Sequence, residues 1–294
     1  MKIAVLLTVY NRIEKTVCCL NSLFRGLDES VDISFDIFIT DDGSTDGTEE
    51  EIKRLFPQDK IYLLKGNGKL FWNGGMINSW KAALDKGGYD GYLWLNNDAE
   101  IFPNLWNELK EADRYSKSQF GQGGIYVGST CNKEKTKITY GGFNFISKWS
   151  LTDEFVIPDG TFRPCQCAHG NITYVSQDVV DKQGILYDKY IHGGSDHDYT
   201  YRAYKRGLPL FVLRTFVGIC ENDHDTDGEQ VKFYRMNLRD RIRYLNSPGG
   251  YNLKNALLFQ RRAFPYRYPF VWLMGYLKAF FPKGRRKLYL YMRR

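Results

Sequence analysis

Acidic side chains stand at two places in this sequence where they could act on a substrate. Asp98 follows the apolar run 92–95, and Asp196 and Asp198 open a stretch with helical spacing. A carboxylate within about 3 Å of a hydroxyl can take its proton as the oxygen attacks. One carboxylate together with phosphate oxygens is an ordinary site for Mg²⁺ or Mn²⁺. These acids are therefore candidates for a general base and for a metal ligand.

Both positions also have an ordinary structural explanation. An Asp at the start of a helix interacts favourably with the helix dipole. Asn96-Asn97-Asp98 could form only a turn before the helix expected at 105–115. Both explanations stay open, because neither pattern by itself requires a ligand.

Polar residues end two earlier apolar runs. Thr8 follows residues 3–7, and Asp41-Asp42 follow residues 35–40. Such residues often cap the next helix, which explains one or two of them but does not require two adjacent acids. A carboxylate at a strand end can accept a hydrogen bond from a base N–H or a ribose hydroxyl. The second strand end therefore predicts a nucleotide contact.

A glycine-rich segment, residues 66–75, contains four glycines and precedes a helix expected at 76–84. Glycine lets the backbone approach a ligand closely, and the start of the following helix favours phosphate. Taken alone this is weak support, because a glycine-rich segment is usually a plain loop.

The elements that position these residues alternate between strand and helix. The sequence predicts strands at 3–7, 35–40, 61–64 and 92–95 and helices at 13–24, 45–55 and 76–84. Such alternation with short connections favours an α/β fold: a Rossmann-like, mostly parallel sheet with helices on both faces. The carboxyl ends of its strands would face one crevice.

After Pro103 the pattern is more mixed. The sequence predicts a helix at 105–115, β-prone segments near 121–128 and 137–146, a strand at 172–175, helices at 176–184 and 196–206, and a strand at 209–217. The second half of the domain is therefore expected to continue the sheet less regularly.

Four motifs in this order resemble the family 2 glycosyltransferases of the GT-A fold, of the bacterial surface-polysaccharide type. They are Thr8-Val9-Tyr10-Asn11-Arg12, the stretch from Asp41 to Thr48, Asn96-Asn97-Asp98, and Ser195-Asp196-His197-Asp198 with Arg202 and Gly207. The resemblance covers roughly residues 1–225. It implies an inverting transferase that uses a nucleotide-diphosphate sugar and Mn²⁺ or Mg²⁺. The acceptor it implies is a glycan or a lipid-linked molecule in cell-surface polysaccharide synthesis.

The resemblance also implies roles for single residues. Asp196 matches the catalytic acid of the family's Glu-Asp pair, and Asp98 matches the last acid of its Asp-x-Asp-type metal motif. His224 is a candidate second metal ligand. The expected nucleotide-binding residues are Thr8, Tyr10, Asp41, Asp42, Asn67, Gly74 and Asn97.

Two residues depart from the family pattern. Asn96 stands where an Asp is often found, which leaves one carboxylate for the metal. Ser195 replaces the Glu beside Asp196, which removes a neighbouring charge that would tend to raise the pKa of Asp196.

Charge is distributed unevenly along the 294 residues. The net charge is +7, yet residues 1–234 sum to −7, and residues 235–294 carry fifteen Lys and Arg against one acid. The aromatic segment 264–281 lies beside the basic cluster, which favours contact with an anionic membrane surface. Nucleic-acid binding would use the same charges, but no nucleic-acid module accompanies them. A helix that docks on the body of the protein is the remaining alternative.

The chain has no run of about 20 apolar residues that could span a bilayer, and its first residues do not form a signal peptide. We therefore expect a cytoplasmic protein, peripheral at the inner face of the membrane. Its six scattered cysteines are expected to be reduced. Cys165 and Cys167 with His169 would make only half of a zinc site.

The expected domains are a glycosyltransferase domain, 1–230, and a basic aromatic extension, 231–294. The first would contain a nucleotide-sugar-binding half, 1–100, and an acceptor half, 101–230. Two other classes of protein stay open. A nucleotidyltransferase of similar layout would favour a basic glycine-rich loop near the first strand. A non-catalytic nucleotide-sugar-binding protein would not need both catalytic acids.

Overall fold

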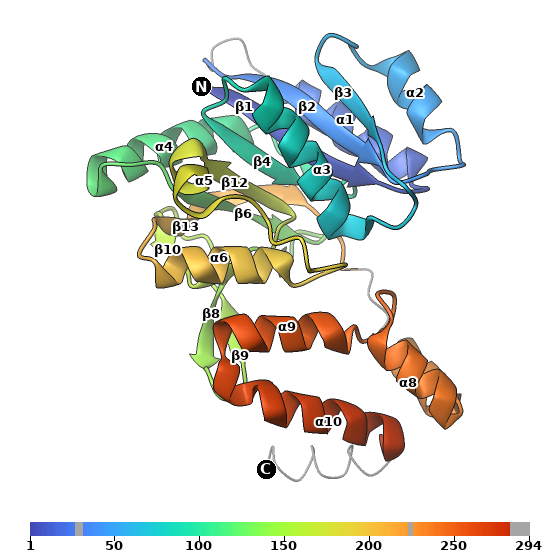
Figure 1. The fold of residues 1–294 in the computed structure, drawn as a ribbon. Helices are drawn as coiled ribbons and strands as arrows, with labels where there is room; N and C mark the ends of the chain where they lie inside the picture. The colour runs from blue at the N-terminus through green and yellow to red at the C-terminus, as the bar shows by residue number, and fades with distance from the viewer. Residues whose placement is uncertain (27–31, 223–225, 283–294) are drawn as a thin grey trace. The chain divides into compact units, whose positions relative to one another are not determined.

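The computed structural model describes residues 1–26, 32–222 and 226–282 (Figure 1). The chain forms two compact units. The first comprises residues 1–189 and 195–222, and the second comprises residues 190–194 and 223–294. The second unit thus includes a short internal segment, residues 190–194, and the expected domain boundary at 230 stays a prediction.

Four parallel strands form one part of the main sheet of the first unit. They are β1 (Lys2–Val9), β2 (Ser34–Asp41), β3 (Ile61–Lys65) and β4 (Gly91–Leu95). β1 lies between β2 and β4, and β3 flanks β2. Val9 lies opposite Asp41, which lies opposite Lys65, so these strands end at the same edge. The polar residues that follow them are brought together there, as the alternating pattern predicts.

The other six strands of this ten-stranded sheet depart from the parallel pattern. They are β5 (Glu100–Ile101), β6 (Ile125–Cys131), β7 (Ile138–Tyr140), β10 (Arg163–Pro164), β12 (Ile172–Ser176) and β13 (Leu210–Ile219). β6 and β13 are parallel, but β12 is antiparallel to both of its neighbours, β4 and β6. Ile172 pairs with Leu95, so β12 begins where β4 ends. The residues before β12 therefore reach the same edge.

Helices cover both faces of the sheet (Figure 1). They are α1 (Ile13–Arg25), α2 (Thr48–Leu55), α3 (Phe71–Lys86), α4 (Leu105–Phe120), α5 (Gln177–Gln183) and α6 (Ser195–Lys205). Ile3, Val5 and Leu7 of β1 are buried with side chains of α1, α2 and α4. Ala4 and Leu6 are buried with side chains of α3, α5 and α6. Successive strand residues point to opposite faces, so a strand that is apolar throughout needs cover on both.

The helix that follows the glycine-rich segment begins earlier than its sequence pattern predicts. α3 starts at Phe71, so Gly74 and Gly75 lie within the helix and not in a loop. A Cβ on Gly75 would collide with Thr8 Oγ1 of β1. Gly75 is therefore needed for close packing of the helix on the strand. The expectation of a loop over all of 66–75 was wrong for its second half.

A separate small sheet supports α6. It consists of β8 (Gly142–Ser147), β9 (Thr152–Phe155) and β11 (Cys167–Ala168). Ala168 N donates to Thr200 Oγ1 at 3.0 Å, and Thr200 Oγ1 donates to Asp196 O at 2.8 Å. These bonds attach the first turn of α6 to β11.

The second unit is helical. Its helices are α7 (Thr226–Arg235), α8 (Leu238–Asn246), α9 (Leu253–Ala263), a short 3₁₀ turn (Pro265–Arg267) and α10 (Tyr268–Phe280). Phe233, Leu245, Leu253 and Ala279 form its core. The segment 190–194 is held by Asn255, whose Nδ2 donates to His192 O at 2.8 Å. This unit is the helical C-terminal region that the sequence predicts.

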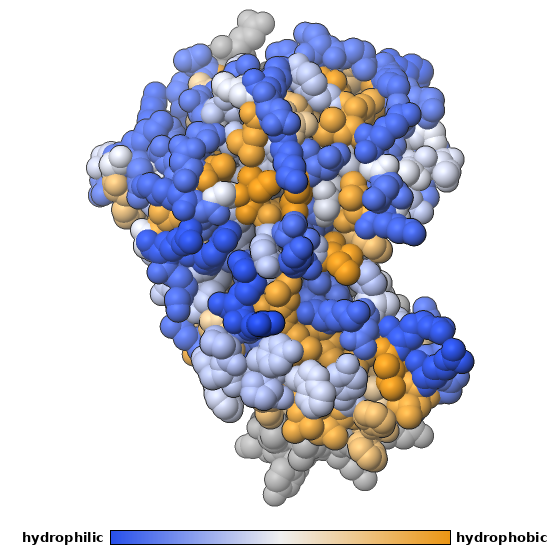
Figure 2. Space-filling model, in the orientation of Figure 1, coloured by the Kyte–Doolittle hydropathy of each residue, from blue (hydrophilic) through white to orange (hydrophobic). Residues whose placement is uncertain are grey.

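Large apolar side chains reach the surface of the second unit, where Figure 2 shows hydrophobic residues beside hydrophilic ones. The exposed side chains include Tyr266, Tyr268, Phe270, Trp272, Leu273, Phe280 and Phe281. No helix within the described residues is both long enough and apolar enough to cross a membrane.

Candidate active site

Side-chain hydrogen bonds join the loop after β1 to the loop after β2. Asn11 Oδ1 accepts from Thr45 N at 2.7 Å, and Asn11 N donates to Ser44 Oγ at 3.0 Å. Asp46 Oδ2 accepts from Ile13 N, the first residue of α1, at 3.0 Å. Asn11 has a φ of 48°, a left-handed conformation that Asn adopts more readily than most residues. The polar residues of the two motifs thus fix each other's backbone.

The adjacent acids at the end of β2 are largely buried and bound to backbone N–H groups. Asp41 Oδ1 accepts a hydrogen bond at 2.8 Å from Ser44 N, in the turn that follows β2. Asp42 accepts from Gly68 N at 2.8 Å, Leu70 N at 2.8 Å and Phe71 N at 3.0 Å. Asp42 therefore fixes the loop between β3 and α3. Its contact with a nucleotide, like that of Asp41, stays a prediction.

The other predicted nucleotide-binding residues differ in exposure: Tyr10 and Asn67 are exposed, Thr8 and Gly74 are half-buried, and Asn97 is buried. Asn97 Nδ2 donates to Thr16 Oγ1 of α1 at 3.0 Å. The buried amide of Asn97 is thus bound within the protein, where it fixes the end of β4 against α1.

Asp98 forms an ion pair with Arg12, from the loop after β1. Arg12 Nη1 lies 2.9 Å from Asp98 Oδ2, and the two side chains are 50% and 21% exposed. Cys220 Sγ lies 3.6 Å from Asp98 Oδ1. Burial, together with the charge of Asp98, raises the pKa of the Cys220 thiol to about 12. The thiol therefore stays protonated beside the acid.

Asp98 fits a cation that is shared with a diphosphate. Within the described ranges, no three His, Cys, Asp or Glu side chains are grouped so that they could hold a metal ion by themselves. A catalytic Mg²⁺ needs only one or two protein carboxylates, because phosphate oxygens and water supply its other ligands. Asp98 is partly exposed and can provide such a carboxylate. The second predicted ligand, His224, lies outside the described residues.

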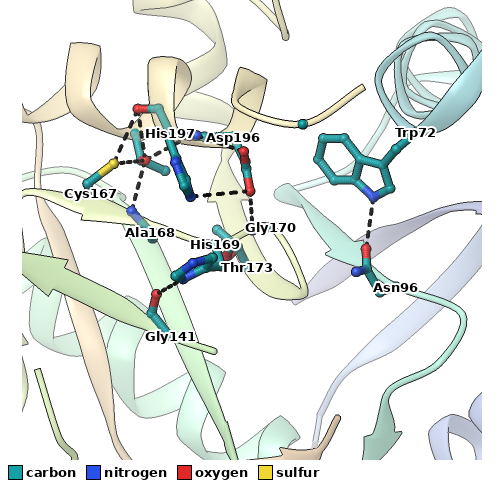
Figure 3. Close-up of polar contacts among 12 residues, drawn as sticks. Trp72, Asn96, Gly141, Cys167, Ala168, His169, Gly170, Thr173, Asp196 and His197 are labelled. Carbon is teal, nitrogen blue, oxygen red and sulfur yellow. Dashed lines mark hydrogen bonds and ion pairs between the residues drawn. The ribbon is translucent and has the colours of Figure 1, made fainter. Parts of the chain in front are cut away.

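Trp72 and Gly170 link the Asn96-Asn97-Asp98 loop to the start of α6 (Figure 3). Trp72 Nε1 donates to Asn96 Oδ1 at 2.8 Å. A Cβ on Gly170 would lie 3.0 Å from the Trp72 ring and 3.2 Å from Asp196 Cβ. Gly170 lies close to Trp72 and Asp196 because it comes just before β12, at the carboxyl end of β4. The antiparallel strand therefore brings Asp196 to the same edge of the sheet as Asp98.

Asp196 is held by backbone N–H groups on both carboxylate oxygens. Oδ2 accepts from Gly170 N at 3.0 Å, and Oδ1 accepts from His197 N at 2.9 Å. Burial by itself would raise the pKa of Asp196. The positive charge that His197 and His169 can carry, with the two backbone bonds, outweighs burial and lowers the pKa. The carboxylate is therefore ionised near neutral pH, as a general base must be.

Two histidines lie next to this carboxylate. The rings of His169 and His197 are 5.0 Å apart, and His197 Nε2 lies 3.9 Å from Asp196 Oδ2. His169 Nδ1 donates to Gly141 O at 3.0 Å. Burial and the neighbouring His197 lower the pKa of His169 to about 4, although Asp196 opposes this effect. His169 is therefore neutral at neutral pH.

The sequence motifs did not identify four residues that shape this site: Arg12, Trp72, His169 and Gly170. Arg12 belongs to the motif after the first strand, which implies no role for it, and the spacing of His169 from Cys165 and Cys167 indicates only half of a zinc site. For Trp72 and Gly170 the sequence offered no signal beyond a glycine and an aromatic residue near predicted turns.

Known proteins resemble this chain in sequence and in structure. Residues 4–183 match the family described as Glycosyl transferase family 2. The mannosyltransferase PcManGT from Pyrobaculum calidifontis, in complex with GDP-Man and Mn²⁺, is 14% identical with a TM-score of 0.53, over 94% of this chain and 73% of that chain. S. aureus TarS 1–349 in complex with UDP is 12% identical with a TM-score of 0.55, over 95% of this chain and 90% of that chain.

The mostly parallel sheet covered by helices on both faces matches the GT-A fold of these neighbours. The family match spans more than half of the sequence, so this chain belongs to glycosyl transferase family 2. Both the family and the fold that the sequence predicts are therefore confirmed.

Proposed function

We propose that this protein transfers a sugar, with inversion, from a nucleotide-diphosphate donor to an acceptor hydroxyl, and that Asp196 is the general base. The observation that carries the proposal is the placement of Asp196. Its carboxylate is ionised and fixed by two N–H groups at the strand edge that also carries Asp98. The printed ligands of the structural neighbours, GDP-Man with Mn²⁺ and UDP, support a donor of this class.

The reaction is a single displacement. The acceptor oxygen forms a bond to the anomeric carbon while the bond from that carbon to the diphosphate oxygen breaks, and its electron pair leaves with the diphosphate. The proton of the acceptor hydroxyl passes to Asp196. Gly170 N–H and His197 N–H keep the carboxylate oriented toward the acceptor, which is the main requirement for a general base.

Asp98 would hold Mn²⁺ or Mg²⁺, with His224 as a second ligand. A divalent cation there would neutralise charge on the diphosphate. Thr8, Tyr10, Asn67 and Gly74 are the accessible residues proposed to contact the nucleotide. Tyr10 is 57% exposed, which suits stacking of its ring on a base.

The acceptor we propose is a glycan or a lipid-linked molecule in cell-surface polysaccharide synthesis, at the inner face of the membrane. The second unit supports this proposal because it exposes aromatic residues in a basic part of the chain. Aromatic side chains insert at the lipid interface, and Lys and Arg attract anionic headgroups.

A donor screen tests the proposed reaction. The protein is incubated with UDP-, GDP- and dTDP-sugars and Mn²⁺, and release of the nucleoside diphosphate is measured. We expect release from one class of donor, and NMR of the transferred product should show an inverted anomeric configuration. Release of the sugar 1-phosphate, with the nucleotide transferred instead of the sugar, would indicate a nucleotidyltransferase. Binding without turnover would indicate a non-catalytic protein.

A further inference from the structure

Arg12 is placed to interact with whatever occupies the predicted metal position. It lies between β1 and α1, in the loop that Asn11 and Asp46 join to the end of β2. Its guanidinium reaches Asp98 Oδ2 at 2.9 Å, although the two residues are 86 positions apart in sequence. The backbone of Arg12 is thus fixed, while half of its side chain is exposed and can move.

The carboxylate of Asp98 is already engaged on both oxygens. Oδ2 accepts from Arg12, and Oδ1 contacts the protonated thiol of Cys220. The neighbouring amides are also engaged, Asn96 with Trp72 and Asn97 with Thr16. A cation that binds Asp98 Oδ2 would lie beside the guanidinium, and repulsion between the two positive charges favours displacement of Arg12.

We propose that Arg12 is an exchangeable counterion, a role that rests on the proposed function. It pairs with Asp98 before the donor binds, and it turns to the donor diphosphate when a divalent cation takes the carboxylate. The planar guanidinium can bind phosphate oxygens through two parallel N–H bonds, so it loses one anionic partner and gains another. Arg12 thereby makes cation binding at Asp98 depend on the presence of the diphosphate.

Titration of the full-length protein with Mn²⁺ alone tests the competition between Arg12 and the cation for Asp98. Binding is measured as the loss of the EPR signal of free Mn²⁺. We expect Arg12→Gln to bind Mn²⁺ about two- to fivefold more tightly than wild type, since exposed ion pairs contribute about that much. Asp98→Asn should bind more weakly, and Arg12→Gln/Asp98→Asn should bind as weakly as Asp98→Asn. Arg25→Gln removes the same charge from the far end of α1 and should leave Mn²⁺ affinity unchanged.

Calorimetric titration with UDP and GDP in the presence of Mn²⁺ tests the second part of the proposal, that Arg12 binds the donor diphosphate. Arg12→Gln should weaken binding of whichever nucleotide the wild type binds. Arg12→Lys keeps the charge but not the planar fork, so its Mn²⁺ affinity should stay close to wild type while its nucleotide affinity falls.

Unchanged or weaker Mn²⁺ binding by Arg12→Gln would overturn the counterion role. So would tighter binding that persists in the double variant, because the cation would then not lie at Asp98. These titrations require no sugar transfer. If the variants bind Mn²⁺ as expected but the wild type turns over no donor, the proposed reaction is refuted, while the competition at Asp98 is established.

Discussion

Asp196 differs from an exposed acid because each carboxylate oxygen already accepts one backbone N–H. These bonds hold the carboxylate without removing its ability to take a proton, since each oxygen has a second lone pair. The amide of Asn has nearly the same shape but cannot accept a proton in this way. Replacement of the Asp196 carboxylate by an amide should therefore affect proton transfer without affecting donor binding.

Asp196→Asn should lose sugar transfer by at least about 10²-fold, the low end for a positioned general base, with little change in donor affinity. Steady-state turnover and nucleotide titration measure the two effects. Asp198 is the comparison, because it lies in the same turn of α6 but is buried. If Asp198→Asn were inactive and folded while Asp196→Asn stayed active, Asp198 would be the base.

His169 should make stability depend on pH. Its pKa is about 4 in the folded protein, against about 6.5 when unfolded. Below pH 6.5 the unfolded chain binds a proton that the folded chain refuses, so the free energy of unfolding falls as pH drops toward 4. The linkage amounts to about 3 kcal/mol.

His169→Asn keeps a donor for Gly141 O but does not titrate. Denaturant unfolding at pH 7, 5.5 and 4 should therefore show a smaller loss of stability for the variant than for wild type. Equal losses of stability in the variant and in wild type as the pH falls would contradict a buried, neutral His169.

At the scale of elements, the packing of α3 on β1 depends on one of two adjacent glycines. A Cβ on Gly75 would collide with Thr8 Oγ1, whereas a Cβ on Gly74 would meet Leu70 Cβ at 3.1 Å, a contact that a small shift relieves. Ala is intrinsically better than Gly inside a helix by about 1 kcal/mol. The two positions should therefore respond differently to the same change.

Gly75→Ala should lower the free energy of unfolding by about 1–3 kcal/mol, the usual cost of overpacking. Gly74→Ala should change it by less than about 1 kcal/mol in either direction. Denaturant midpoints of the two variants, each measured with its slope, provide the comparison. Equal losses would show that the packing of α3 does not depend on Gly75.

The limits of sequence interpretation are clearest for these elements. Strands 3–7 and 92–95 were predictable because each is a local apolar run. The roles of Asp98 and Asp196, which the sequence motifs suggest, stay predictions. The antiparallel direction of β12 was not predictable, because an apolar run of five residues does not encode direction. The Arg12–Asp98 and Trp72–Asn96 contacts were missed for a related reason: each joins residues that only the folded sheet brings together.

At the scale of the whole molecule, the second unit is proposed to contact the membrane. Deletion of residues 264–294 would be a poor test, because it removes Phe264 and Ala279, which are buried in that unit. Substitution of exposed side chains is cleaner. Phe270, Leu273 and Phe281 are each at least 45% exposed.

A triple variant should no longer sediment with vesicles that contain phosphatidylserine. It combines Phe270→Ser, Leu273→Ser and Phe281→Ser. The matched control replaces Ile146, Trp149 and Ile157, exposed residues of the first unit, with Ser. High salt should weaken binding of the wild type without abolishing it, because inserted rings are not screened. Equal sedimentation of both variants would refute the membrane role of this surface.

The position of β4 between β1 and β12 has a consequence during synthesis of the chain. Every residue of β4, Gly91–Leu95, is buried in the finished sheet, but its partner β12 begins only at Ile172. At about 5–20 residues per second, the ribosome needs several seconds to deliver that partner. Until then, the newly made first half has an apolar edge strand with unpaired backbone groups, the kind of edge that recruits other chains. Slow translation between residues 95 and 172 would therefore favour aggregation of the nascent protein, and a chaperone that shields this edge would favour correct folding.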